Sequence, residues 1–411
     1  MTNDRVVGPW GEIPPENPAT PRQSSTAPQA VPTSSADAVN LGDGRMEKLV
    51  FSGERREFSA ITWRGMALYL PTFGFYRFWL KTDQRRFYWG HTSLEGSSFE
   101  YRGTPRELLT GFLIAIAVYM PISVVYFLLG LYAETLQDFA SAPFFLFTVL
   151  FGYFAAYRAR RYRLTRTVYR GVRFWMEGSA WKFAGIAFLW LLLTIITLGV
   201  AFPWMVAALE RRKMRNSFYG DLRGEFTGTG WELCKALIMP GLGLVIGAVI
   251  PLLNLIAIPV MLSVITVRTS RWFANGARFG AVSGLSDIES FALAGPIVKA
   301  ALITVLFWII WGAIGTGFGF ALSRSLLGSS QSIESLFSSF PAIMAIGVWT
   351  MVGLLATGCI KAIFYDYEKT VRILKSLTFT NLGALDAVEA KGDLASSFGE
   401  GLADALGSDG F

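Results

Sequence analysis

Long apolar runs separated by short basic segments dominate the chain from about residue 60 onward. We count seven runs, at 60–80, 108–132, 140–157, 183–207, 236–267, 297–321 and 341–363. A helix needs about 20 apolar residues to cross a bilayer, and most runs reach or nearly reach that length. Run 60–80 is weaker because Arg64 and Arg77 lie inside it. The pattern predicts an all-α polytopic membrane protein with about four to seven membrane-spanning helices.

The basic residues between the runs conflict with seven simple crossings. Lys and Arg gather in three connecting segments, at 81–107, 158–182 and 208–235. Basic loops are retained in the cytoplasm, but seven crossings would place two of these segments on opposite sides of the membrane. The conflict disappears if runs 60–80 and 183–207 are re-entrant or broken helical hairpins, and run 236–267 either does the same or crosses twice near Pro251. In that arrangement the other four runs cross, and both termini are cytoplasmic. Seven ordinary spans with one anomalous loop are the alternative.

The basic segments resemble one another, which indicates an internal repeat. The pattern R-x9-G-x2-F-x3-G occurs at Arg86–Gly103 and again at Arg161–Gly178. Alternating aromatic or β-branched residues surround a turn-rich centre in each copy, so we expect repeated short β-hairpin-like inserts on the cytoplasmic side. Weaker copies lie at 268–285 and 371–384. The copies could join into a small sheet beneath the membrane, or each could lie among the lipid headgroups.

The two ends of the chain differ from the apolar part. Residues 1–46 hold seven of the 17 prolines and show no apolar periodicity, so they are predicted to form a disordered tail. They also lack the apolar stretch that follows the basic start of a signal peptide. The polytopic domain is expected over 47–385, with a short C-terminal tail over 386–411.

Composition agrees with a membrane protein. Hydrophobic residues make up 52% of the chain and charged residues only 16%, whereas a typical soluble domain has about 25% charged residues. The net charge of +7 is explained by basic loops retained near anionic lipid, so no nucleic-acid partner is expected.

The residues that usually carry chemistry are scarce. The chain has one histidine, His91, and two cysteines, and it contains no HExxH, GxSxG or phosphate-binding loop motif. We therefore predict no catalytic, cofactor or metal site, and no enzyme. The apolar cores of most runs contain no ionisable residue, which counts against a proton-coupled carrier. His91 is expected to be exposed in its loop, and Asn254 to hydrogen-bond a neighbouring helix.

Two sets of residues are candidates for contacts in or at the membrane. Basic residues interleaved with aromatic ones could bind anionic headgroups, and the candidates are Arg85, Arg86, Arg160, Arg161, Arg211 and Arg212. Glycines with small-xxx-small spacing favour close helix packing, and the candidates are Gly243, Gly247, Gly315 and Gly319. The expected partners are membrane lipids and either a second copy of the chain or another membrane protein.

A combination of motifs resembles the YjgN family of bacterial multi-pass inner-membrane proteins. The motifs are Phe51-Ser-Gly with Glu57-Phe58, Thr72-Phe-Gly-Phe-Tyr-Arg-Phe-Trp-Leu-Lys-Thr, Arg85-Arg-Phe-Tyr-Trp-Gly-His-Thr, Leu94-Glu-Gly, Phe218-Tyr-Gly-Asp-Leu and Gly399-Glu-Gly-Leu-Ala-Asp-Ala-Leu. The resemblance covers about residues 47–411. It implies a bacterial inner-membrane location and a domain of unknown function, and it implies no catalytic residues.

These observations favour a non-enzymatic membrane scaffold or lipid-associated assembly protein. The alternative is a channel or transporter for a small or amphipathic solute, because broken segments can line a pathway. A membrane enzyme is a third and weaker interpretation. A transporter needs a polar or water-accessible path between its spans, whereas a scaffold can be packed solid.

Overall fold

The computed structural model describes residues 44–132, 137–249, 254–327 and 340–392, with the side chains of 130–142, 246–256 and 318–343 left out of the description. The described residues alternate paired helices with short strands. The helices are α1 (Arg55–Tyr69), α2 (Arg77–Gly90), α3 (Pro105–Tyr132), α4 (Gln137–Arg166), α5 (Ala180–Ile196), α6 (Phe202–Arg215), α7 (Gly230–Val249), α8 (Asn254–Gly276), α9 (Ala294–Leu327), α11 (Phe340–Lys361) and α12 (Tyr367–Lys375).

The strands are two to five residues long. They are β1 (Met46–Lys48), β2 (Val50–Phe51), β3 (Thr92–Leu94), β4 (Ser97–Tyr101), β5 (Thr167–Tyr169), β6 (Val172–Met176), β7 (Ser217–Tyr219), β8 (Leu222–Phe226), β9 (Ala277–Phe279), β10 (Val282–Ser286) and β11 (Leu377–Thr380). Each of the two segments predicted to form a hairpin, 86–101 and 162–176, contains one: β3–β4 in the first and β5–β6 in the second. In the first two hairpins an X-Gly pair with positive φ makes the turn, at Glu95-Gly96 and at Arg170-Gly171, as tight hairpins prefer.

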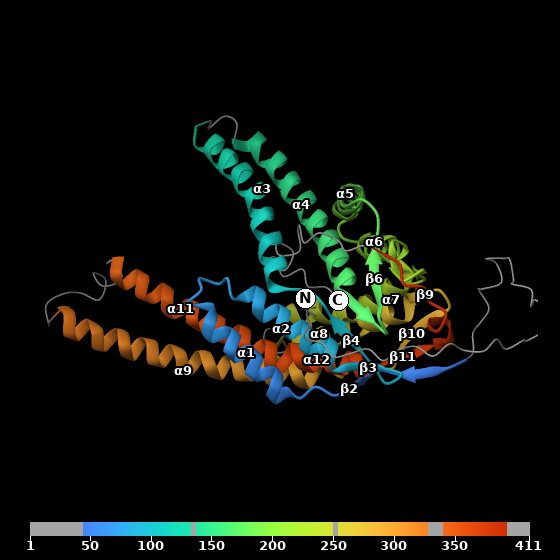
Figure 1. Ribbon diagram of the computed structural model, residues 1–411. Helices are drawn as coiled ribbons and strands as arrows, with labels where there is room; N and C mark the ends of the chain where they lie inside the picture. The colour runs from blue at the N-terminus through green and yellow to red at the C-terminus, as the bar shows by residue number, and fades with distance from the viewer. Residues whose placement is uncertain (1–43, 133–136, 250–253, 328–339, 393–411) are drawn as a thin grey trace, which may run out of the picture. The chain divides into compact units, whose positions relative to one another are not determined.

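All of these strands join into one antiparallel sheet with the order β1-β11-β10-β9-β8-β7-β6-β5-β4-β3-β2 (Figure 1). The first and last strands of this order are consecutive in the chain, separated only by Leu49. The run from Met46 to Phe51 therefore bonds β11 with its first half and β3 with its second half. If β1 and β2 are counted as one strand, the sheet has an even number of strands. A closed ring in which all neighbours are antiparallel requires an even number. We call this sheet the strand ring.

Side chains fill the strand ring. Its buried core contains Leu49, Leu94, Tyr169, Tyr219 and Val282 together with Leu382 from a 3-10 turn at Leu382–Leu385. Two tyrosines link successive hairpins, because the Tyr169 hydroxyl donates to the Leu94 carbonyl (2.9 Å) and the Tyr219 hydroxyl donates to the Tyr169 carbonyl (3.0 Å). The ring is therefore a packed core and not an open pore.

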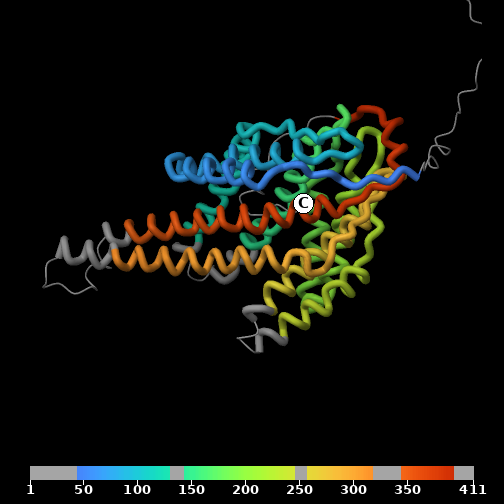
Figure 2. The backbone as a smooth tube through the Cα atoms, turned by 90° about the horizontal axis from the view of Figure 1, so that it is seen from below, coloured from blue at the N-terminus to red at the C-terminus, as the bar shows by residue number. Residues whose placement is uncertain are grey.

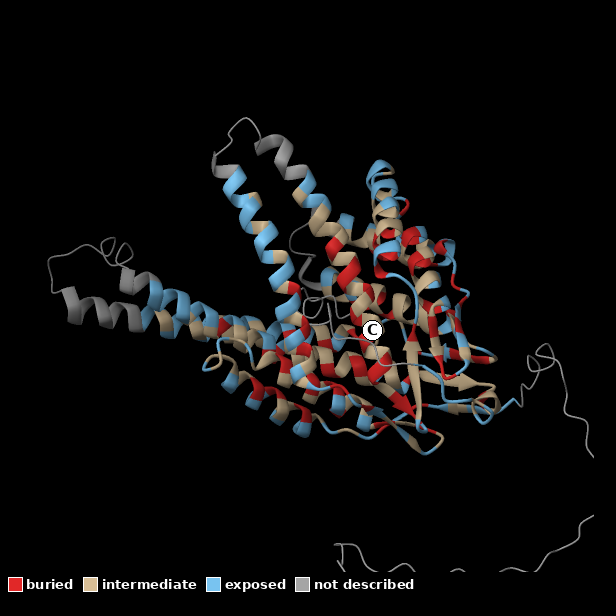
Figure 3. Ribbon diagram, turned by 45° about the horizontal axis from the view of Figure 1, so that its top comes forward, coloured by how far each residue is buried: buried red, intermediate tan, exposed pale blue. Residues whose placement is uncertain are grey.

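Five pairs of helices connect neighbouring parts of the ring within the described residues. They are α1–α2, α3–α4, α5–α6, α7–α8 and α9–α11. Figure 2 shows the two members of α1–α2 and of α9–α11 lying side by side. Each pair leaves the ring after one strand and returns to an adjacent strand. Buried residues gather where the helices meet the ring, and exposed residues cover the outward parts of α3 and α9 (Figure 3).

The predicted all-α class is wrong, because the hairpins form an 11-stranded sheet. Each strand is too short to form a stable sheet alone. The sheet arises from pairings such as β4 with β5, whose partners Phe99 and Tyr169 lie about 70 residues apart. Such long-range pairing leaves no local periodicity in the sequence.

Three helices among the described residues are long and apolar enough to cross a membrane, over Pro105–Leu129, Ala294–Gly317 and Met344–Lys375. They correspond to three of the four runs expected to cross. The fourth, 140–157, lies in α4 and is not among them. Runs 60–80 and 183–207 each break into two helices around a turn. The predicted tail 1–46 is described only from residue 44, and the predicted tail 386–411 only to residue 392.

Candidate membrane-contact site

Two turns with the same geometry form the outer ends of α1–α2 and α5–α6. In the first, the Thr72 hydroxyl donates to the Leu68 carbonyl (2.6 Å) and accepts from the Tyr76 amide (3.1 Å). In the second, the Thr197 hydroxyl donates to the Leu193 carbonyl (2.8 Å) and accepts from the Ala201 amide (3.1 Å). We call residues 72–75 and 197–200 the apolar turns.

Each apolar turn holds a large apolar residue in the left-handed region and exposes it. Phe73 and Leu198 both have φ of 50°, and both are 94% exposed. The glycines that follow, Gly74 and Gly199, have φ of 83° and 91°. The left-handed conformation costs a non-glycine residue about 1–2 kcal/mol. An apolar side chain that is strained and also exposed stabilises nothing within the protein, so it points to a contact outside the chain.

Charged residues limit how deep these two helix pairs can enter a bilayer. In α1–α2, an ion pair joins Arg64 to Asp83 (3.1 Å). In α6 the first charge, Glu210, lies eight residues after Phe202, which is about 12 Å along a helix. The apolar length of α6 before its first charge is therefore less than half of the hydrocarbon core, which is about 30 Å thick. In α2 the first charge, Arg77, comes two residues after Phe75. One helix of each pair therefore carries a charge too close to the turn for that helix to cross, so each turn can enter one leaflet at most.

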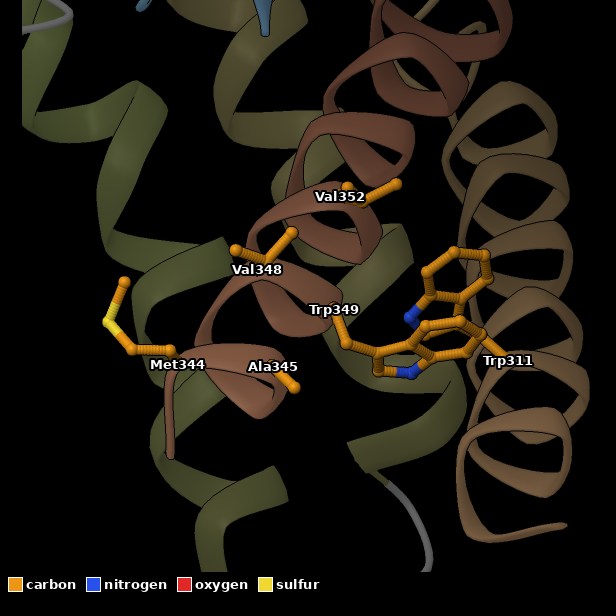
Figure 4. Close-up of a pocket in the computed structure, with 6 residues that line it drawn as sticks. All are labelled: Trp311, Met344, Ala345, Val348, Trp349 and Val352. Carbon is orange, nitrogen blue, oxygen red and sulfur yellow. The ribbon is translucent and has the colours of Figure 1, made fainter. Parts of the chain in front are cut away.

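Longer apolar surfaces belong to α3–α4 and α9–α11. Two tryptophans hold α9 against α11, because the Trp311 and Trp349 rings stack at 4.0 Å (Figure 4). Each ring packs against a glycine of the facing helix, Trp349 against Gly315 and Trp311 against Gly353. A Cβ at either glycine would lie within 3 Å of the ring, so only glycine leaves room for it. An open groove of about 490 Å³ beside them is lined by Trp311, Met344, Ala345, Val348, Trp349 and Val352. The lining is apolar apart from the indole N–H groups of the two tryptophans, and the Trp311 Nε1 is buried without a hydrogen-bond partner.

Charge clusters lie at the ring-proximal ends of the helices. Glu107 at the start of α3 accepts from Arg166 (3.0 Å) and from the Tyr162 hydroxyl (2.7 Å) at the end of α4. It also forms a capping box, accepting from the Thr104 amide (3.4 Å) while its own amide donates to the Thr104 hydroxyl (3.3 Å). The same box recurs at Thr229 and Glu232. These contacts fix where α3 and α7 leave the strand ring.

A second cluster joins α4 to α6. Arg160 donates to Glu210 (2.9 Å), and Lys213 pairs with the same carboxylate. Burial opposes the charged form of Glu210, but the Lys213 ammonium and the Arg160 guanidinium outweigh it and lower the pKa of this carboxyl. A carboxylate buried between two cations stabilises the fold, because removing one partner leaves the remaining charges buried without compensation.

Of the arginines that were candidates for headgroup contact, the structure buries only Arg85; Arg86 and Arg211 are exposed, and Arg160, Arg161 and Arg212 are half-buried. Arg85 is buried and donates to the Tyr101 hydroxyl (3.1 Å). Arg86 donates to the Gly103 carbonyl (3.0 Å), and Arg211 makes the equivalent bond to the Gly228 carbonyl (3.2 Å). Arg160 pairs with Glu210, as above. Arg161 and Arg212 lie near enough to Tyr157 to interact with it electrostatically. Lipid contact by these six remains a prediction.

The other candidates have mixed outcomes. Gly243 faces Met261 between α7 and α8, and Gly315 faces Trp349. The surroundings of Gly247, Gly319 and Asn254 lie outside the described side chains. The predictions missed Trp311 and Trp349, although both stand out as tryptophans within apolar runs.

His91 is half-buried and not simply exposed. Its Nδ1 lies 2.8 Å from the Phe87 carbonyl, and its Nε2 lies 3.4 Å from Glu57. Among the residues that the structure describes, no group of three His, Cys, Asp or Glu side chains could hold a metal ion.

The model of one protein family matches residues 46–405, and its description is "Bacterial protein of unknown function (DUF898)". The match starts at the first residue of β1 and includes every strand of the ring. This family is consistent with the YjgN resemblance. No curated protein and no solved structure matches the chain.

Proposed function

The chain belongs to the bacterial DUF898 family, and we propose that it is a non-enzymatic scaffold that holds its strand ring against one face of the inner membrane. One observation carries this proposal: every described helix pair begins and ends on the same ring. A pair whose two ends are neighbours in one sheet must return to the side from which it left. A crossing by α3 therefore requires a return by α4, and α9 and α11 are related in the same way.

The same geometry supports a cytoplasmic position for the ring. The three basic segments 81–107, 158–182 and 208–235 all contribute strands to it. Basic segments are retained in the cytoplasm, and a common ring removes the conflict that seven simple crossings create. Because β1 and β11 pair with each other, Met46 and Thr380 share this side.

Three observations favour a scaffold over a channel or transporter. The interior of the ring is filled, with Leu382 fully buried at its centre. The groove beside α9 and α11 is apolar. The apolar cores of the candidate spans contain no ionisable residue, so they offer no polar path for a solute.

Single-cysteine labelling tests the one-sided arrangement. Cysteines are placed at exposed ring positions, as Glu100→Cys, Asp221→Cys and Arg278→Cys, in a chain in which Cys234 and Cys359 are changed to alanine. Thr135→Cys, between α3 and α4, is the control for the opposite face. We expect the three ring positions to label only in inverted vesicles and position 135 only in intact cells. Labelling of any two ring positions from opposite sides would refute the scaffold.

A permeability measurement tests the alternative directly. The full chain is reconstituted into liposomes loaded with a small anionic dye, and in parallel with glycerol. We expect the vesicles to retain both solutes as well as protein-free vesicles do. Protein-dependent release of either solute would favour the transport interpretation.

A further inference from the structure

A basic cavity lies between α7, α8 and the segment that follows β8. Its volume is about 550 Å³. Three cationic side chains line it, Lys235 from α7 and Arg268 and Arg271 from α8. Glu232 is the one carboxylate in the lining, and its Oε2 already accepts the Thr229 amide (3.1 Å). The cavity therefore carries an excess of positive charge.

No carboxylate among the described residues forms an ion pair with these three cations. Arg268 donates to the Ala236 carbonyl (3.1 Å), and Arg271 donates to the Ile288 carbonyl. A carboxylate within electrostatic reach of Arg271 is Asp287, whose pKa is lowered mainly by the hydrogen bond that it accepts from Lys48 (2.8 Å). The charge of Arg271 adds a smaller lowering of the same pKa. The carbonyl bonds position both guanidinium groups without neutralising them.

One donor in this cavity has no acceptor. The Nε of Arg271 is buried and makes no hydrogen bond. A buried donor without a partner is destabilising, and more so when the group is charged. A guanidinium presents its N–H groups as a planar fork that matches the oxygens of a phosphate. The excess positive charge of the cavity is therefore best balanced by an anionic, phosphate-like group.

The walls of the cavity fit a lipid at the membrane surface. Trp272 donates its indole N–H to the Thr229 carbonyl (3.2 Å), which fixes one wall. Trp231, one turn before Lys235 on α7, is exposed, and the Lys235 ammonium lies 5.5 Å from the centre of its ring. Further along α7, Met239 and Leu242 are exposed and apolar. Tryptophan and lysine mark the headgroup level, and the apolar residues beyond them provide a surface for acyl chains.

We propose that this cavity binds the phosphate of an anionic phospholipid, with Arg268, Arg271 and Lys235 around the phosphate and the acyl chains along α7. The proposal rests on the membrane embedding described above. Soluble phosphate shares the headgroup chemistry but makes no use of the apolar surface of α7. A lipid should therefore bind much more tightly than free phosphate.

Native mass spectrometry of the full chain in mixed micelles of phosphatidylglycerol and phosphatidylcholine tests this site. The variants are Lys235→Gln and Arg268→Gln, and the control is Lys182→Gln, an exposed lysine beside Trp181 on α5. A basic residue near an anionic surface contributes about 1 kcal/mol, which corresponds to about fivefold in affinity. We expect each variant to retain about fivefold less phosphatidylglycerol, and the control to retain as much as the unchanged chain.

Two results would overturn the proposal. Equal phosphatidylglycerol retention by all four proteins would exclude a role for the cavity. Displacement of the lipid by equimolar inorganic phosphate would show that the site takes a soluble anion. Membrane fractionation of the same variants separates this failure from failure of the scaffold, because loss of the lipid site leaves the helix pairs in the membrane.

Discussion

Leu198→Asp should lift the apolar turn at 197–200 out of the membrane without unfolding the protein. Leu198 is 94% exposed, so the side chain contributes almost no burial within the chain. If the turn lies in lipid, the bilayer supplies that burial, which is about 1.5–3 kcal/mol for a leucine. An aspartate costs about 2.5–3.5 kcal/mol at the bilayer centre and less at the depth of about 12 Å that α6 permits. We expect a total penalty of about 3 kcal/mol, or more than a hundredfold in the inserted population.

Depth-dependent fluorescence quenching measures this effect. A fluorophore on Val200→Cys, in the chain without its own two cysteines, reports the depth of the turn. Lipids brominated at different positions along the acyl chain should quench it most strongly within one leaflet. Leu198→Asp should shift the quenching toward the headgroups. Leu285→Asp, at an exposed leucine of the strand ring, should leave it unchanged.

Either of two results would refute the insertion of this turn into one leaflet. Quenching of the unchanged turn by aqueous iodide, and by no brominated lipid, would show that the turn is in water. Quenching from both leaflets would show that α5–α6 crosses the membrane, so the limit set by Glu210 would be wrong.

Three further predictions concern packing and charge. Glu210→Gln should destabilise the protein by about 3–5 kcal/mol because it leaves Arg160 and Lys213 without their carboxylate; a melting temperature in detergent equal to that of the exposed Glu225→Gln would contradict this. Gly315→Leu should cost about 1–3 kcal/mol by overpacking, since its Cβ would lie 2.7 Å from Trp349, whereas Gly317→Leu meets open space and should melt normally. Hydrogen bonds and charge from Arg45 and Arg170 lower the pKa of Asp386 from 3.8, so its contribution to docking residues 382–389 is present above pH 3.8 and is lost as the pH falls through the lowered value. Hydrogen exchange of that segment should rise on acidification, and an exchange rate in Asp386→Asn equal to that of the unchanged chain at pH 7 would count against this contact.

Local patterns in the sequence were informative where one short segment decides the outcome. Alternation around Gly96 and Gly171 predicted hairpins, and strands lie on both sides of each. The interrupted run 60–80 and the Gly199 turn in run 183–207 predicted breaks, and both runs form helix pairs. Turn chemistry and apolar length act over a few residues, so they can be read without the rest of the chain.

The apolar runs that could cross a membrane were predicted from the sequence alone, and three of the four runs expected to cross lie in helices long and apolar enough to do so. The strand ring was decided only by the tertiary structure, because its closure depends on β1 meeting β11 more than 300 residues later. The contacts of the six arginines also depended on the fold, since Arg86 and Arg211 donate to backbone carbonyls in the segments that follow β4 and β8. The basic cavity follows the same rule. Lys235 and Arg268 are 33 residues apart, and only the pairing of α7 with α8 brings their charges to one place.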